Sequence, residues 1–239
     1  GHLGLFGYDP IRFQVGRGVL EALGIDFELR PGDVAARGNF CTVDSAGRIT
    51  DRRAGRIRTE LCARLCQRLR TIRLDGIEIF VEPVKDHRFA LVLRGRSLSG
   101  RLSETDPQAL GGPPLPVKAL HPDAEPTASL VNRFIESARQ LLVDSTPANM
   151  VLLRGFDRLA ELPAFPKIFR MKSAGIAAYP MYRGLARLVG MEILKTGPSF
   201  ADELTTLRQN WETYEFFFLH YKDNAQAGED GDFDAKVAA

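Results

Sequence analysis

Apolar residues along the chain recur with a helical period in two segments. From residue 57 to residue 69 an aliphatic side chain stands at every fourth position, which places these side chains on one face of an α-helix. They are Ile57, Leu61, Leu65 and Leu69. A second helix is predicted over residues 128–142. Residues 95–127 between these segments are rich in Gly, Pro, Ser and Asp, so we expect a long ordered loop or linker there.

Shorter apolar runs predict β-strands in the first half of the chain. Residues 77–81 and 89–93 are rich in Ile, Val, Leu and Phe and are separated by a short polar connection, so they predict one antiparallel pair. Residues 40–43 predict another strand, followed by a turn at 44–47 and a returning strand at 48–50. A short basic segment therefore follows a hairpin.

Three further apolar runs alternate with helical segments in the second half of the chain. The runs are residues 150–153, 175–179 and 216–220. Continuous apolar strands that alternate with helices are typical of a mostly parallel sheet covered on both faces. Ligands bind such sheets beyond the carboxyl ends of the strands. This rule points to Arg154 and to the segment that follows His220.

Length, net charge and cysteine content exclude some classes of protein but do not identify the function. The 239 residues suffice for one large or two small domains, and the formal net charge is only +2. That charge argues against a protein that grips nucleic acid, and no apolar run approaches the roughly 20 residues that span a bilayer. Cys41, Cys62 and Cys66 indicate reduced structural thiols. We therefore expect neither a nucleic-acid nor a membrane partner, and a cytoplasmic location.

Arginines gather in the segment that follows the predicted hairpin. Residues 52–58 contain four arginines, and 25 of the 32 basic residues in the chain are Arg. A guanidinium matches two oxygens of a phosphate or carboxylate, so Arg52, Arg53 and Arg56 are candidate ligands of a phosphorylated substrate. A solvated basic loop that pairs with Asp51 is the equal alternative. His87 lies between two predicted strands, where it either contacts a phosphoryl group or caps a turn.

An acidic stretch near the end of the chain is a candidate metal site. Residues 223–234 contain five carboxylates, whose oxygen atoms suit Mg²⁺ and Mn²⁺. The same stretch is also typical of a solvated loop that leads into a helix, with Asp232 as its N-cap. The chain has no glycine-rich phosphate loop, because its early glycines lack the required strand, spacing and lysine.

Several ordered motifs together resemble one enzyme family over essentially the whole chain. They are HLGLFGYDP at 2–10, GRGVLEALG at 16–24, GDVAARGNF at 32–40, DRRAGR at 51–56, EPVKDHRFALVLRG at 82–95 and GEDGDF at 228–233. The chain resembles the cofactor-independent phosphoglycerate mutases of the archaeal type, which belong to the alkaline phosphatase superfamily. The resemblance implies an α/β fold with a mostly parallel alkaline-phosphatase-like sheet and an inserted smaller α+β domain.

The resemblance also implies a domain division and a reaction. Residues 1–23 and 155–239 are expected in the phosphatase-like metal domain, and residues 24–154 in an insert that orients the substrate. Two divalent ions, Mn, Mg or Zn, are expected in the full-length protein to activate a serine that takes the phosphoryl group of phosphoglycerate. That serine is expected upstream of His2, so we expect this chain to be a truncated and inactive piece. A homo-oligomer is a further expectation.

The resemblance assigns roles to particular residues. Arg52, Arg53 and Arg56 match the motif that grips the substrate, and four more residues match positions around the same cleft. These are His87, Arg88, Arg94 and Arg154. Metal binding is expected of Asp223 and Glu229. The family usually has an aspartate where this chain has Ala225, and a methyl group cannot bind a cation.

That departure keeps three hypotheses open. The first is a metal-dependent mutase that interconverts 3-phosphoglycerate and 2-phosphoglycerate through a phosphoserine. The second keeps the fold and changes the reaction to hydrolysis of a phosphate or phosphonate ester. The third is a non-catalytic protein that binds phosphorylated metabolites, for which Ala225 is the best support.

Overall fold

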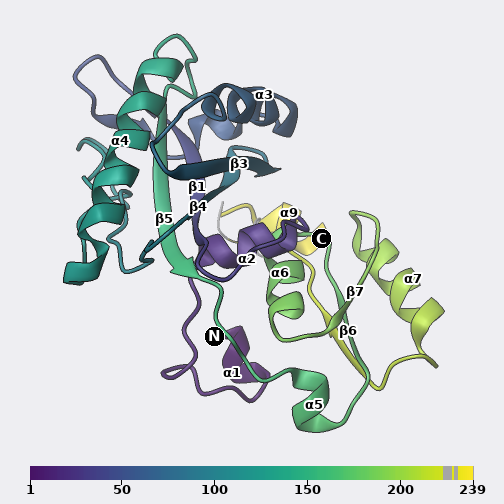
Figure 1. The fold of residues 1–239 in the computed structure, drawn as a ribbon. Coiled ribbons are helices and arrows are strands. Elements are labelled where there is room, and N and C mark those ends of the chain that lie inside the picture. The colour runs from purple at the N-terminus through teal and green to yellow at the C-terminus, as the bar shows by residue number, and fades with distance from the viewer. Residues whose placement is uncertain (223–227, 229–230, 239) are drawn as a thin grey trace. The chain divides into compact units, whose positions relative to one another are not determined.

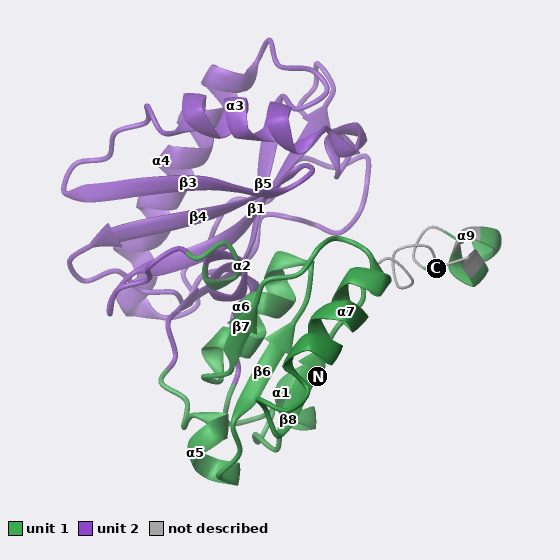
Figure 2. Ribbon diagram, turned by 90° about the vertical axis from the view of Figure 1, so that its right-hand side faces the viewer, with its two compact units in different colours: residues 1–13, 23–26, 161–239 green, residues 14–22, 27–160 purple. Residues whose placement is uncertain are grey.

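The computed structural model describes residues 1–222, 228 and 231–238. The chain divides into two compact units, which Figure 2 shows in different colours. Unit 1 comprises residues 1–13, 23–26 and 161–239, and unit 2 comprises residues 14–22 and 27–160. Helix α2 (Arg17–Gly24) is divided between them. The assignment of these units to a metal domain and a substrate-orienting insert stays a prediction.

Unit 2 is built on an antiparallel sheet. Its strands are β1 (Val34–Val43), β2 (Ile49–Asp51), β3 (Ile77–Lys85), β4 (Arg88–Gly95) and β5 (Met150–Arg158). Strand β1 lies at the centre, because it pairs with β4 along one edge and with β5 along the other. Strand β3 pairs with β4, and β2 pairs with the end of β1. Figure 1 shows β1, β4 and β5 running side by side.

Two helices cover one face of this sheet. Helix α3 (Thr59–Leu69) and helix α4 (Glu125–Leu142) contribute buried side chains to the same core as the strands. Phe40 and Phe89 of neighbouring strands contact each other in that core, with ring centroids 4.9 Å apart, and Phe134 of α4 is fully buried there. Short 3-10 helices lie at Ala54–Arg56 and Pro122–Ala124. The core lies between the sheet and its two helices.

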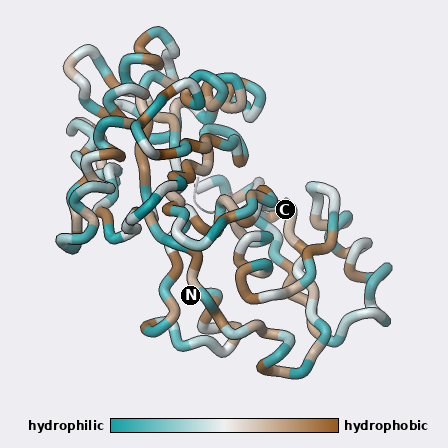
Figure 3. The backbone as a smooth tube through the Cα atoms, in the orientation of Figure 1, coloured by the Kyte–Doolittle hydropathy of each residue, from teal (hydrophilic) through white to brown (hydrophobic). Residues whose placement is uncertain are grey.

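Side chains of β1 alternate between the two faces of the unit 2 sheet, so the face opposite α3 and α4 carries polar side chains. Val34, Ala36 and Phe40 point into the core, so the intervening side chains of Arg37 and Asn39 point to the other face. Figure 3 shows stretches of hydrophobic residues along the strands, separated by more hydrophilic helices and loops. We call the face of the unit 2 sheet that carries Arg37 and Asn39 the arginine face.

Unit 1 contains a parallel sheet with helices on both sides. Strand β6 (Ser173–Ile176) pairs in parallel with β7 (Glu192–Leu194) and with β8 (Phe216–Leu219). Helices α6 (Pro180–Leu188) and α7 (Phe200–Asn210) lie on opposite sides of this sheet (Figures 1 and 2). The shorter helices of this unit are α1 (His2–Leu5), α5 (Phe165–Phe169) and α9 (Phe233–Ala238).

The structure confirms the mixed α/β fold class and most of the predicted elements. The two helices predicted from the periodicity are α3 and α4, and the predicted antiparallel pair is β3 with β4. The parallel arrangement predicted for residues 150–153 is wrong, because β5 runs antiparallel to β1. A continuous apolar run indicates that both faces of a strand are buried, and it does not indicate the direction of the strand. Val151 and Leu153 enter the main core, whereas Met150 and Leu152 join a small apolar cluster on the other face.

The three cysteines are buried and form no disulfide. None of the helices in the described part of the chain combines the length and the apolar character that a membrane-spanning segment requires. Most of the connection predicted at residues 95–127 is a long loop, with one short 3-10 helix and an isolated bridge between Leu102 and Ala119, but α4 already begins at Glu125.

Close packing of α2 on β1 leads to a first prediction, for Gly18. A Cβ atom at Gly18 would lie 2.4 Å from the backbone of Ala35. Alanine favours a helix over glycine by about 1 kcal/mol, but the collision with backbone atoms should outweigh this gain. We expect Gly18→Ala to lower the free energy of unfolding by about 1–3 kcal/mol in urea denaturation.

Gly112→Ala is the matched control for this substitution, because a Cβ atom at Gly112 would have no neighbour within 4 Å. It should change the unfolding free energy by less than about 1 kcal/mol. Equal stability of the two variants would contradict close packing of α2 against β1.

Candidate functional site

Three strands place arginines together on the arginine face. Arg37 of β1 stands directly opposite Arg154 of β5, and Asn39 of β1 stands directly opposite Arg88 of β4. Directly opposed residues of antiparallel strands share a face, with Cβ atoms about 4.5–5.5 Å apart. The side chains of Arg37, Arg88 and Arg154 therefore gather over the middle of the sheet.

A buried carboxylate lies beneath these arginines. Glu21 comes from α2 and is fully buried, with Oε1 3.6 Å from Nε of Arg37. Burial raises the pKa of Glu21, while the positive charges of Arg37, Arg88 and Arg17 act in the opposite direction. Neither carboxylate oxygen accepts a hydrogen bond from the part of the chain that the structure describes. The ionic contact to Arg37 is thus the main interaction of this carboxylate.

His87 lies in the same electrostatic environment. It is only 2% exposed, and burial together with the positive charges of Arg88, Arg37 and Arg53 lowers its pKa to about 3. The imidazole is therefore neutral near pH 7, where it can exchange hydrogen bonds without adding a further positive charge. The charges of Arg88 and Arg53 thus both act on His87, and the role of these residues in substrate binding stays a prediction.

The arginine-rich segment 51–56 forms a tight turn rather than a free loop. The Asp51 carboxylate accepts hydrogen bonds from the backbone N–H groups of Arg53 at 2.7 Å and Gly55 at 2.5 Å. Ala54, Gly55 and Arg56 all have positive φ angles, which non-glycine residues seldom adopt. Ala54 is buried in the core, while the side chains of Arg53 and Arg56 are exposed. The turn thus presents two guanidinium groups to solvent.

Arg52 and Arg154 share a buried carboxylate. Arg52 makes a two-pronged contact with Asp106, with Nε and Nη2 at 2.9 and 2.7 Å from the two carboxylate oxygens. Arg154 approaches the same carboxylate at 3.4 Å and also donates from Nε to Glu104 at 3.1 Å. The Asp106 side chain is fully buried, whereas that of Arg52 is 30% exposed. These contacts fix both arginines in position beside the arginine face.

Arg94 is the predicted residue that the structure does not bring to this cluster. It lies near the opposite end of β4 from Arg88 and forms a two-pronged contact with Asp33 at 2.9 and 2.7 Å. Its guanidinium also lies over the ring of Phe80, 4.8 Å from the centroid. These partners hold the Arg94 side chain in place, and its role in substrate binding stays a prediction. The alternation of side chains between the two faces of a strand shows which residues share a face, but it does not show which end of β4 lies near the site.

The predicted metal ligands Asp223 and Glu229 lie outside the described residues. Within the described ranges, no group of three or more His, Cys, Asp and Glu side chains is placed to hold a metal ion. The described residues therefore do not form a metal site on their own. His220 follows β8 and stacks on Tyr182 near His2, and burial together with the charge of His2 lowers its pKa to about 4.

Sequence reasoning missed four of the residues described above. Arg37 and Asn39 stand at alternate positions in an otherwise apolar strand, and this pattern could have marked them as one polar face. Glu21 lies within an apolar helical segment, which makes it a candidate for a buried charge. Asp106 had no local signal, because only the tertiary fold brings it to Arg52.

Comparison with known proteins assigns the chain to a family. Residues 1–149 match the sequence model of the 2,3-bisphosphoglycerate-independent phosphoglycerate mutases. The chain belongs to this family. The phosphoglycerate mutase family is a family of isomerases, in agreement with the resemblance in the motifs.

The relatives in this mutase family come from several bacteria. A probable 2,3-bisphosphoglycerate-independent phosphoglycerate mutase of Thermotoga maritima is 46% identical over 239 residues, which is 99% of this chain and 59% of the relative. One from Thermus thermophilus is 45% identical over 242 residues, 99% of this chain and 60% of the relative. The chain thus spans about three fifths of the length of these relatives.

Solved structures of similar proteins agree with the fold. A cofactor-independent phosphoglycerate mutase from Thermoplasma acidophilum has a TM-score of 0.65 at 30% identity, covering 100% of this chain and 69% of that protein. A protein from Pyrococcus horikoshii has a TM-score of 0.76 at 22% identity, covering 99% of this chain and 58% of that protein. The second likeness concerns the fold alone.

The Asp106 contacts generate a prediction about stability and pH. Burial raises the pKa of Asp106, but the hydrogen bond from Arg52 and the further contacts to the charged form outweigh it, so the net pKa is lowered. A lowered pKa contributes stability above the unfolded-state pKa of about 3.9, and this stability is lost as the pH falls through the folded-state value. We expect Asp106→Asn to lower the free energy of unfolding by about 2–4 kcal/mol near pH 7.

Urea denaturation between pH 3 and pH 8 measures this difference, which should shrink as the pH falls below about 4. Glu136→Gln is the control, because Glu136 forms an exposed ion pair with Arg139 and should affect stability little. A difference between wild type and Asp106→Asn that is independent of pH would contradict the ionic role of Asp106.

Proposed function

We propose that unit 2 binds the phosphate and carboxylate of phosphoglycerate at the arginine face, and that the whole protein interconverts 3-phosphoglycerate and 2-phosphoglycerate. The observation that carries this proposal is the gathering of Arg37, Arg88 and Arg154 on one face of the sheet, where Arg88 follows the buried His87. The positive charge of Arg53 also acts on His87. Phosphoglycerate carries two oxyanions on a three-carbon frame. Several guanidinium groups held at one place suit both of them.

Each group in the cluster has a distinct part in this binding. Arg53, on the exposed turn, reaches a phosphate or carboxylate from solvent, while Arg37 and Arg88 hold it from the sheet. The neutral imidazole of His87 supplies a hydrogen bond without further charge. Arg52 and Arg154 are already held by Asp106, which orients them before the ligand arrives. Positioning in advance lowers the cost of ordering the site on binding.

The proposed reaction proceeds through a phosphoserine. A serine oxygen attacks the phosphorus, the bond to the glycerate oxygen breaks, and glycerate leaves with a proton on that oxygen. Glycerate then turns, and its other hydroxyl oxygen attacks the same phosphorus and releases the serine. We place this serine in a part of the protein outside this chain, so we expect no turnover from the 239 residues alone. Retention of glycerate by the arginines separates this reaction from simple hydrolysis.

We propose that the whole protein requires divalent metal, with Asp223 and Glu229 among its ligands. Divalent ions would neutralise the oxygens of the phosphoryl group during the displacement. The acidic composition of residues 223–234 and the membership in the mutase family support this proposal. Metal identity, location in the cytoplasm and self-association stay predictions.

Binding of 3-phosphoglycerate to the 239-residue chain tests the proposed site. Arg53→Ala removes an exposed guanidinium, while the backbone N–H that donates to Asp51 remains. Loss of one charge-assisted contact should weaken binding about tenfold in isothermal titration calorimetry.

Arg48→Ala is the matched control, because Arg48 lies in the hairpin that precedes Arg53, is 60% exposed and pairs with Asp44. Its affinity for 3-phosphoglycerate should stay within about twofold of the wild-type value. Equal weakening by both variants would show a diffuse charge effect and would overturn the assignment of Arg53.

The proposal about metal is tested at Ala225. Ala225→Asp restores a carboxylate at the position where the family usually has one, and we expect Mn²⁺ to bind the variant about tenfold more tightly in calorimetry. Ala227→Asp adds the same charge two residues away and should have a smaller effect. If the two variants bind Mn²⁺ equally, position 225 is not a ligand position.

A further inference from the structure

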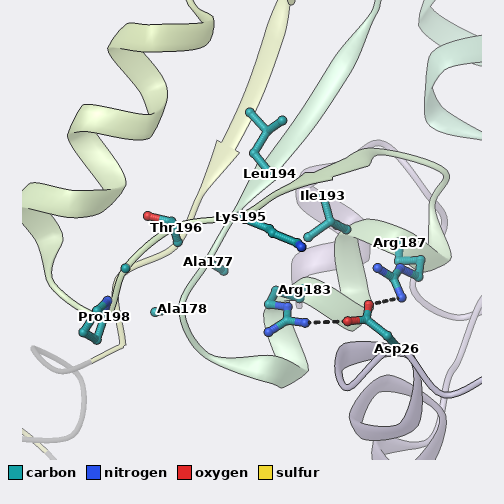
Figure 4. Close-up of a pocket in the computed structure, with 11 residues that line it drawn as sticks. Asp26, Ala177, Ala178, Arg183, Arg187, Ile193, Leu194, Lys195, Thr196 and Pro198 are labelled. Carbon is teal, nitrogen blue, oxygen red and sulfur yellow. Dashed lines mark hydrogen bonds and ion pairs between the residues drawn. The ribbon is translucent and has the colours of Figure 1, made fainter.

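A pocket of about 490 Å³ lies at the carboxyl ends of two strands in unit 1, and none of its lining residues belongs to the arginine face. Its walls come from residues 177–178 after β6, residues 193–198 at the end of β7, one side of α6 and Asp26. All of these residues belong to unit 1. Figure 4 shows the pocket with its lining side chains. Pockets of this size accept small metabolites.

The topology of the unit 1 sheet explains why a pocket forms here. The chain leaves β6 toward α6 and leaves the neighbouring β7 toward α7, and these helices lie on opposite sides of the sheet (Figures 1 and 2). The two connections therefore diverge from adjacent strand ends. This divergence leaves room for a pocket beyond the carboxyl ends of the strands, which is the end of an α/β sheet where ligands bind.

The pocket carries an excess of positive charge. Arg183, Arg187 and Lys195 line it, together with a single carboxylate, that of Asp26. Arg183 and Arg187 are four residues apart on α6, so they lie on the same face of that helix. Figure 4 shows the Lys195 ammonium pointing toward the two guanidinium groups. In the described part of the chain, Lys195 has no carboxylate within ion-pair distance.

The Asp26 carboxylate lies between the two arginines and contacts both guanidinium groups. Its Oδ2 lies 3.1 Å from Nη2 of Arg183, and its other oxygen contacts Nη1 of Arg187. One carboxylate thus contacts two guanidinium groups. Most of their N–H donors remain available to a ligand, and the positive charge of Lys195 is not neutralised. Glu203 accepts the backbone N–H of Ala178 behind the pocket, so that amide is not available to a ligand.

We propose that this pocket binds the phosphate group of a small phosphorylated metabolite, held by Arg183, Arg187 and Lys195. A phosphate dianion matches the net excess of two positive charges, and guanidinium forks suit its oxygens. Ile193 and Pro198 provide apolar surface for the carbon part of the ligand. Asp26 competes with the phosphate for the two arginines, because both are anions at the same position.

Titration of the 239-residue chain with inorganic phosphate tests the proposal, with backbone amide shifts followed by NMR. Shifts at Ala178, Thr196 and Gly197 report this pocket, whereas shifts at Asn39 and Arg88 report the arginine face. We expect saturable shifts at the first group. Lys195→Met should weaken phosphate binding there about tenfold, since it removes one of three cations. Asp26→Asn should strengthen it severalfold by removing the competing charge.

Lys167→Met is the matched control, because Lys167 belongs to α5 of the same unit and does not line the pocket. It should leave the affinity for phosphate unchanged. A parallel titration with citrate distinguishes the ligand classes, and tighter binding of citrate than of phosphate would overturn the phosphate assignment. Shifts confined to Asn39 and Arg88, or equal affinities of the Lys195 and Lys167 variants, would overturn the pocket as a site while leaving the proposed function intact.

Discussion

Unit 2 depends on the position of β1 between β4 and β5, with both pairings antiparallel. Because strand side chains alternate between faces, this single placement sends Phe40 and its apolar neighbours toward α3 and α4, and sends Arg37 and Asn39 to the opposite face. A shift of the register by one residue would exchange the two sets and bury guanidinium groups in the core. The hydrophobic core therefore determines where the arginines lie.

Carboxylates then determine how these arginines are held. Glu21 contacts Arg37 from below, Asp106 holds Arg52 and Arg154, and Asp51 shapes the turn that presents Arg53. Buried charges are tolerated only with partners of opposite sign. The contacts therefore serve stability and orientation together. A cluster of arginines without these carboxylates would repel itself and leave its side chains free to move.

The cationic pocket of unit 1 arises from a different structural feature than the arginine face of unit 2. There the pocket lies where two connections leave neighbouring strands of a parallel sheet toward opposite sides. Arg183 and Arg187 are neighbours because of the helical period, and Asp26 stabilises this pair of like charges. The two units thus gather positive charge by the alternation of a strand in one case and by the turn of a helix in the other.

Local patterns in the sequence determined the existence of α3, α4 and the β3–β4 pair, because helical and strand periods are visible within single segments. Motifs in the sequence also determined the family. Only the tertiary structure decided that β5 runs antiparallel to β1, that Asp106 joins Arg52 to Arg154, and that Arg94, near the other end of β4 from Arg88, pairs with Asp33. These facts depend on contacts between residues about 50 or more positions apart in the chain, and the local alternation of apolar and polar residues carries no information about them.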